Sequence, residues 1–116
     1  MTTTPAPVIL SFLPGEHSPS GMVVHEVTER PDLAQRPFSA SRFTVPPGAT
    51  SELDQHEVAE LWMVAAGCGT VHSEERRLDI GAGDVVLLPS RAPHRLENTG
   101  SQPVEVFSVW WQENRS

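Results

Sequence analysis

Four residues between positions 54 and 94 combine types and spacings that suit metal chemistry. Asp54 and His56 lie two positions apart, so on an extended segment their side chains project from the same face. Glu60 follows at an even offset and can face the same way if it opens the next strand. His94 lies on a later extended run and could reach this point from across a barrel. Two imidazoles and two carboxylates suit one divalent ion such as Zn, Mn, Ni or Fe.

The composition excludes several other kinds of chemistry. The eight basic residues are all arginine, and there is no lysine or tyrosine, so a Schiff-base lysine, a P-loop lysine and a tyrosine acid are excluded. The single cysteine, Cys68, cannot form an internal disulfide or a cysteine-based zinc cage. The net charge of −7 disfavours nucleic acid and anionic membranes as partners. With no visible secretory signal or membrane span, we expect a cytoplasmic protein.

The elements that must position these residues are short strands. The 11 prolines and 8 glycines are spread along 116 residues, with short apolar runs between them, which is typical of an all-β sandwich or barrel of one domain. One helical turn could fit in residues 27–35, residues 67–69 are expected to form a hairpin turn, and residues 1–7 are expected to be disordered, leaving 8–116 as the domain. Strands are expected at residues 8–10, 22–27, 38–45, 60–65, 70–72, 76–79, 84–88, 94–96 and 104–111.

Two spaced motifs resemble those of the small single-domain cupins, whose fold is a jelly roll of two antiparallel sheets. The first motif reads Gly48, five residues, Asp54-Gln55-His56, three residues, Glu60, six residues, Gly67. The second reads Gly83, five residues, Pro89-Ser90-Arg91, two residues, His94, three residues, Asn98. The resemblance covers residues 43 to 111 and implies that Asp54, His56, Glu60 and His94 occupy the metal-ligand positions of the family.

The chain departs from the cupin pattern at two motif positions. Arg91 stands where the family usually has glycine, which is a change within a loop. Asp54 stands where the family usually has its first histidine, so the common set of three histidines and one glutamate becomes two histidines and two carboxylates. This harder, more anionic set favours Lewis-acid chemistry over chemistry that needs a readily oxidised iron. Iron is not excluded, since two histidines and one carboxylate form an oxygenase triad if Asp54 stays off the metal.

The resemblance implies a metal-dependent enzyme of bacterial specialised metabolism that acts on a small molecule. Isomerisation, cyclisation, elimination and rearrangement all fit a Lewis acid, with Glu60 as a proton shuttle. Three alternatives stay open. The first is an iron-dependent dioxygenase of the same fold, and the second is a cupin that works with a methionyl-tRNA synthetase-like partner and forms N–N bonds. The third is a cupin that binds a small ligand without catalysis.

Three further residues are candidates for the substrate pocket. Trp62 is in register with Glu60 and would line the same cavity. Arg42 could bind a substrate carboxylate through two parallel hydrogen bonds, and Phe107 belongs to the aromatic end of the last strand. Trp110 and Trp111 end that strand on opposite faces, so one of them is expected in the sandwich and the other at a subunit interface. Together with the resemblance, this surplus of tryptophan predicts a homodimer.

Overall fold

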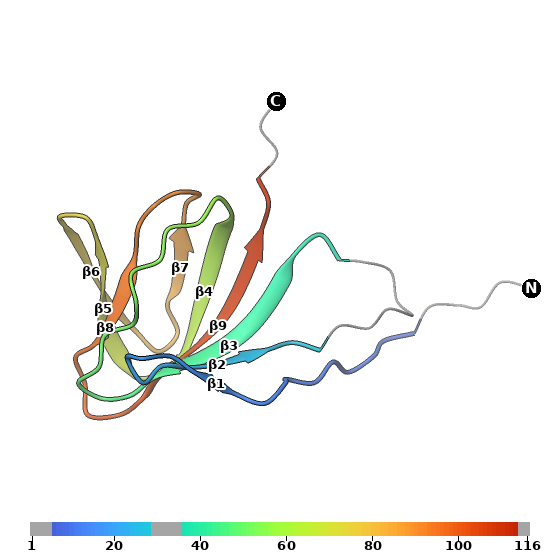
Figure 1. The fold of residues 1–116 in the computed structure, drawn as a ribbon, viewed down its shortest axis with the longest axis horizontal. Coiled ribbons are helices and arrows are strands. Elements are labelled where there is room, and N and C mark those ends of the chain that lie inside the picture. The colour runs from blue at the N-terminus through green and yellow to red at the C-terminus, as the bar shows by residue number, and fades with distance from the viewer. Residues whose placement is uncertain (1–5, 29–35, 114–116) are drawn as a thin grey trace, which may run out of the picture.

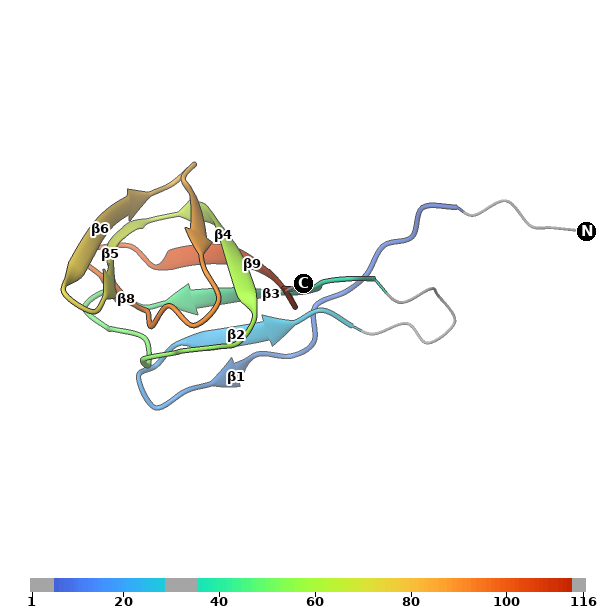
Figure 2. The same cartoon turned by 90° about the horizontal axis from the view of Figure 1, so that it is seen from above.

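The chain folds into antiparallel strands arranged in two sheets. The computed structural model describes residues 6–28 and 36–113, and it contains no helix within those ranges. One sheet has the order β1-β2-β3-β9-β4-β7 and the other the order β6-β5-β8, and they face each other (Figures 1 and 2). The predicted all-β sandwich of two antiparallel sheets is therefore confirmed. The strands are β1 (Glu16–His17), β2 (Val23–Glu26), β3 (Ser39–Val45), β4 (Ala59–Ala66), β5 (Cys68–Ser73), β6 (Arg76–Gly81), β7 (Val85–Leu88), β8 (Arg95–Asn98) and β9 (Val104–Trp111).

The core lies between the two sheets and follows the alternation of each strand. In β9, Val104 and Val106 point inward and are completely buried, as are Val45 of β3 and Leu96 of β8. Trp62 of β4 packs edge to face on Phe43, with ring centroids 5.2 Å apart. Trp62 is 3% exposed, so its large ring joins the core and anchors the inner face of β4.

The chain crosses from the large sheet to the small one at Gly67. The strand before it, β4, pairs with β7 and β9, whereas the strand after it, β5, pairs with β6 and β8. The hairpin expected at residues 67–69 is therefore wrong, because the strands on its two sides belong to different sheets. Gly67 has a φ of +84°, and a Cβ there would lie 2.5 Å from the carbonyl oxygen of Pro103. The corner thus requires glycine for both its conformation and its space.

The N-terminal part of the fold differs from the sequence prediction. Residues 8–10 form no strand, and Ile9 is 92% exposed. The free edge of β2 is instead occupied by the two-residue strand β1, which the sequence analysis missed, and by a bridge from Phe12 to Val27. The other eight expected strands correspond to β2 through β9. The helical turn expected at 27–35 and the disordered segment 1–7 fall mostly outside the described residues, at positions 29–35 and 1–5. No membrane-spanning helix occurs in the described part of the chain.

Candidate metal centre

The segment between β3 and β4 runs beside β8 and behaves as an additional short strand. Its backbone bonds to β8 include Ser51 N–H to the Leu96 carbonyl at 2.8 Å. Further along, Asp54 and His94 exchange backbone hydrogen bonds in both directions, at 2.9 and 2.8 Å. Two residues that face each other in an antiparallel pair project their side chains to the same side. This pairing is what brings Asp54 and His94 together from distant parts of the chain.

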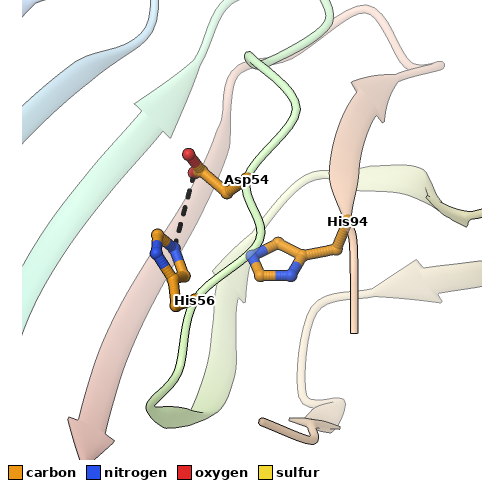
Figure 3. Close-up of side chains that lie close together, drawn as sticks. All are labelled: Asp54, His56 and His94. Carbon is orange, nitrogen blue, oxygen red and sulfur yellow. Dashed lines mark ion pairs between the residues drawn. The ribbon is translucent and has the colours of Figure 1, made fainter. Parts of the chain in front are cut away.

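Asp54, His56 and His94 form a cluster of three possible metal ligands. One donor atom of each lies within 4.8 Å of the others, and Figure 3 shows the three side chains converging from the segment before β4 and the start of β8. The His56 Nε2 lies 3.9 Å from Asp54 Oδ2, and the two imidazole centroids are 5.6 Å apart. Donors bound to Zn²⁺ at about 2.1 Å lie about 3.4 Å from one another, so modest side-chain rotations would close the cluster around an ion.

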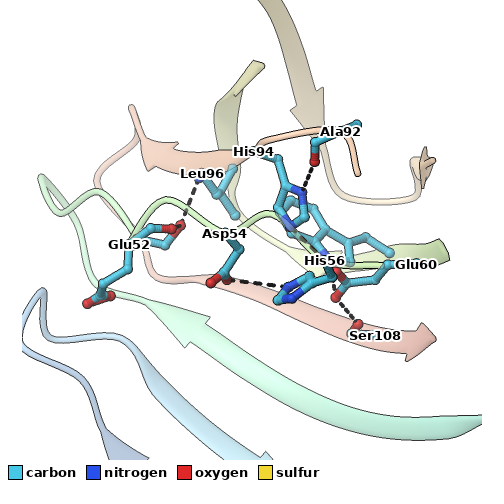
Figure 4. Close-up of polar contacts among 10 residues, drawn as sticks. Glu52, Asp54, His56, Glu60, Ala92, His94, Leu96 and Ser108 are labelled. Carbon is cyan, nitrogen blue, oxygen red and sulfur yellow. Dashed lines mark hydrogen bonds and ion pairs between the residues drawn. The ribbon is translucent and has the colours of Figure 1, made fainter. Parts of the chain in front are cut away.

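His94 is the best-oriented ligand of the cluster. Its side chain is 5% exposed and its ring packs edge to face on Trp62, with centroids 5.5 Å apart. Its Nδ1 lies 3.0 Å from the carbonyl oxygen of Ala92, so the neutral imidazole carries its proton on Nδ1 and keeps the Nε2 lone pair for a ligand (Figure 4). Burial opposes the charged form, but the hydrogen bonds to Glu60 and Ala92 outweigh it and raise the pKa of His94.

Glu60 lies beside the three-residue cluster. Its Oε2 accepts hydrogen bonds from Trp62 Nε1–H, at 2.8 Å, and from the Ser108 hydroxyl, while its Oε1 lies 3.5 Å from His94 Nε2 (Figure 4). Burial raises the pKa of Glu60, but the hydrogen bonds from His94, Ser108 and Trp62 outweigh burial and hold that pKa below its ordinary value. Glu60 is therefore a fixed, ionised carboxylate with one oxygen turned toward the cluster.

A cavity of about 290 Å³ opens over the cluster and contains Glu60 and Trp62 in its lining. Two of the expected pocket residues, Arg42 and Phe107, are not part of that lining. In β3, Ser41 and Phe43 line the cavity, so Arg42 between them projects from the opposite face of the sheet. Its guanidinium lies 4.9 Å from the ring centroid of Phe12.

Phe107 is the register partner of Arg42 and lies on the same outer face, with its ring centroid 6.2 Å from that of Phe12. Phe107 was predicted to line the pocket, but it is the neighbour of Ser108, which is the residue that points inward, is buried and bonds to Glu60. The even and odd positions of a strand face opposite sides, so an error of one residue moves a side chain out of the cavity.

Part of the cavity wall comes from β2, for which the sequence pattern indicated no role in the site. Val24 and Glu26 of β2, and Met22 just before the strand, line it at a spacing of two, which is the usual pattern of one strand face. Trp110 of β9 completes the aromatic part of the wall. The alternation around β2 was visible in the sequence, but nothing in it indicated that β2 would neighbour the strand that carries Ser41.

Glu52 ties the ligand-bearing segment to the turn between β1 and β2. One carboxylate oxygen accepts from the Ser20 backbone N–H and the other from the Ser20 hydroxyl, both at 2.9 Å. The hydrogen bonds from Ser20 and then Ser18 lower the pKa of Glu52 from 4.5 to about 2. A carboxyl whose folded-state pKa is lowered stabilises the fold above its unfolded pKa, and this contribution is lost as the pH falls toward 2.

We therefore expect Glu52→Gln to lower the free energy of unfolding at pH 7 by about 1 kcal/mol, a value reduced for solvent screening because Glu52 is largely solvated. Urea unfolding of both proteins from pH 7 to pH 2 measures this effect, and the difference between them should shrink as the pH falls below 4.5. Glu75→Gln, in the exposed turn between β5 and β6, removes the same charge and serves as the control. A difference that stays constant over this pH range would contradict the assignment.

Comparison with known proteins agrees with the fold and with the two sequence motifs. The family model described as Cupin domain matches residues 41–110. The xanthan biosynthesis protein XanB of Xanthomonas campestris is 38% identical over 79 residues, which are 67% of this chain but only 17% of that protein. The oxalate-binding protein of Thermotoga maritima is 34% identical over 70 residues, which are 60% of this chain and 58% of that protein.

The solved structures give the same result for the fold. A cupin 2 conserved barrel domain protein from Salinispora arenicola superposes with a TM-score of 0.73 at 24% identity, and the match covers 97% of this chain and 91% of that one. The family match spans both motifs, including His56, Glu60 and His94, and its residues run from β3 to β9. The chain therefore belongs to the cupin domain family.

Proposed function

We propose that this cupin holds one divalent metal ion through Asp54, His56 and His94 and is a metal-dependent enzyme that acts on a small molecule. The observation that carries the proposal is the convergence of these three donors at a cavity, where the bond from Nδ1 to Ala92 makes Nε2 the ring nitrogen of a neutral His94 that a metal can use. Two imidazoles and a carboxylate are a donor set that Zn²⁺, Mn²⁺, Ni²⁺ and Fe²⁺ accept. When bound, such an ion supplies a Lewis acid that polarises a substrate oxygen.

The protein's own contribution would be orientation and proton transfer. Glu60 Oε2 is held by Trp62 and Ser108, so the oxygen that would take a proton from a substrate is Oε1, which lies 3.5 Å from His94 Nε2. The lowered pKa of Glu60 keeps it ionised and able to accept a proton, as a weaker base than a glutamate of ordinary pKa. The apolar walls formed by Phe43, Trp62 and Trp110 would exclude water from the reacting atoms. Isomerisation, cyclisation, elimination and rearrangement fit this arrangement.

One observation favours a second candidate, an iron-dependent dioxygenase. Glu60 lies outside the group of three mutually close donors, so the group contains two histidines and a single carboxylate. This is the composition of the triad found in non-haem iron oxygenases. The identity of the bound metal separates the two candidates, because a redox-inactive ion supports only the Lewis-acid reactions.

The test is elemental analysis of the full chain purified without added metal and again after dialysis against divalent ions. We expect near-stoichiometric metal in the wild type and in a control His17→Ala, His72→Ala double variant, and its loss from His56→Ala, His94→Ala. Zn, Mn or Ni would support the Lewis-acid enzyme, and Fe would support the oxygenase. A wild type that contains no metal and takes none up would contradict both, leaving a metal-free binding protein; one of the relatives is named as an oxalate-binding protein.

The origin, metabolic role and cellular location of the protein are also part of the proposal. The basic set made only of arginine suits a bacterial origin, and the resemblance to small cupins is the basis for a role in specialised metabolism. The exposed thiol of Cys68 is compatible with the reducing cytoplasm. The N–N bond-forming alternative and its synthetase-like partner stay a prediction from the sequence.

We also propose a homodimer formed through the outer face of the large sheet. Met63 of β4 and Val85 of β7 are cross-strand partners, and Leu87 follows on the same face, with exposures of 39%, 63% and 60%. Because β7 is an edge strand of the sheet, a second copy related by a twofold axis could cover this face. Light scattering should give twice the chain mass for the wild type and for Leu78→Glu on β6, and the monomer mass for Leu87→Glu. A monomeric wild type would contradict the proposal.

A further inference from the structure

The cavity is strongly anionic. Three carboxylates line it, from Glu26, Asp54 and Glu60, and none of its described lining residues is an arginine. Because the chain has no lysine, arginine is the only permanent cation it could have used. Arg42 instead lies 4.0 Å from Glu105 on the outer face of the sheet. A divalent ion at the cluster would leave a net charge of about −1 in the cavity, if the histidines bind as neutral ligands.

Glu26 lies at one end of a row of paired residues that crosses the large sheet. Glu26 of β2 pairs with Ser41 of β3, Ser41 pairs with Ser108 of β9, and Ser108 pairs with Trp62 of β4. Three strand spacings separate β2 from β4, or about 14 Å between backbones. Ser108 also donates a hydrogen bond to Glu60. Glu26 therefore lies at one end of a row whose other end, Trp62, contacts His94 of the cluster.

Glu26 lacks the histidine partner that each of the other two carboxylates has. Asp54 lies near His56, and Glu60 accepts two hydrogen bonds and lies 3.5 Å from His94 Nε2. No described side chain donates a hydrogen bond to Glu26 or forms an ion pair with it. Glu26 is exposed, but some desolvation of its carboxylate, and then the charge of Glu16, raise its pKa. Its neighbours on the wall, Val24 and Met22, are apolar. A cation bound beside Glu26 would supply the missing counter-charge.

We propose that the cavity takes a small molecule with an apolar body and a cationic far end, a primary ammonium group paired with Glu26. This inference rests on the proposed function for the near end, which would face Asp54, His56 and His94. The apolar body would lie along Phe43, Val24 and Trp110. A ligand with an anionic far end would meet the unpaired carboxylate of Glu26 and bind more weakly.

The test compares three probes that share one ring and differ in charge: benzylamine, benzyl alcohol and benzoate. Trp62 and Trp110 line the cavity, so quenching of their fluorescence reports on binding. Titrations use the full chain after treatment with a chelator, so that no metal binds the benzoate. We expect benzylamine to bind about threefold to fivefold more tightly than benzyl alcohol, as one partly exposed ion pair allows, and benzoate to bind more weakly than both.

The variants assign the preference to Glu26. Glu26→Gln should bring benzylamine to the level of benzyl alcohol and leave benzyl alcohol unchanged, and Glu26→Arg should favour benzoate. Glu75→Gln removes one charge from an exposed turn away from the cavity and should behave as the wild type. Thermal unfolding of each variant checks that the fold is intact.

Three results would overturn the inference: benzoate binding as tightly as benzylamine, equal effects of Glu26→Gln and Glu75→Gln, or no saturable quenching by any probe in the millimolar range. Metal uptake measured on the same preparations keeps the two proposals distinct. A preference that depends on Glu26 in a protein that takes up no metal would contradict the metal function alone. Metal uptake without that preference would contradict this inference alone.

Discussion

Replacing Gly67 with alanine is expected to destabilise the fold by about 3 kcal/mol or more, which is a large part of the 5–15 kcal/mol typical of a single domain. Two effects combine at this residue. Its φ of +84° is unfavourable for any residue with a Cβ, and that Cβ would meet the Pro103 carbonyl at 2.5 Å and the Val104 Cα at 2.8 Å. Because both atoms belong to the backbone entering β9, the substitution must displace β4 or β9. Urea unfolding at equilibrium measures the loss.

Gly48 offers a matched control that separates the two effects. Its φ is +78°, close to that of Gly67, but a Cβ at Gly48 would have no atom within 4 Å. Gly48→Ala should therefore cost only the conformational strain, about 1 kcal/mol. Equal losses for the two variants would mean that the corner between the sheets tolerates a side chain, contrary to the close approach of Pro103.

His94→Ala is expected to lower the affinity for Zn²⁺ by at least about 100-fold, whereas Glu60→Gln should lower it by about 10-fold. His94→Ala removes a donor atom that the hydrogen bond to Ala92 already orients. Glu60→Gln keeps an oxygen to accept the hydrogen bonds from Trp62 and Ser108, and removes only the charge 3.5 Å from His94 Nε2. Competition with a chromophoric chelator at pH 7 measures both affinities.

His72→Ala is the control for this pair, because His72 lies on β5 and bonds to Glu97 at 2.8 Å, away from the cluster. It should bind Zn²⁺ as tightly as the wild type. If Glu60→Gln proved as damaging as His94→Ala, Glu60 would have to be a direct ligand, and its bonds to Trp62 and Ser108 would have to rearrange when the ion binds.

The spacing in the sequence indicated three side chains that meet at the cluster and a fourth, Glu60, that lies beside it. Asp54 and His56 share a face because they are two residues apart, and His94 was placed across the barrel by the second motif. The strands β2 to β9 were likewise visible as apolar runs between turn residues. These features depend on local periodicity, which a sequence carries directly.

The features that the sequence did not predict depend on which strands are neighbours. The faces of Arg42 and Phe107 are set by the register between β3 and β9, in which the two residues pair on the outer side of the sheet. The role of Glu26 depends on β2 lying next to β3, and the corner at Gly67 depends on β4 and β5 pairing with different partners. Such pairings join distant parts of the chain and leave no local pattern.

The reciprocal backbone bonds between Asp54 and His94 have a thermodynamic consequence. The two residues occupy one rung where the segment before β4 closes onto β8, and both also offer a donor atom to the cluster. An ion held by both side chains would cross-link this backbone pair, so the two segments could separate locally only after the ion had left. Hydrogen exchange at these two amides would then slow as ion concentration rises, and the rim of the barrel would be most rigid when the site is ready for substrate.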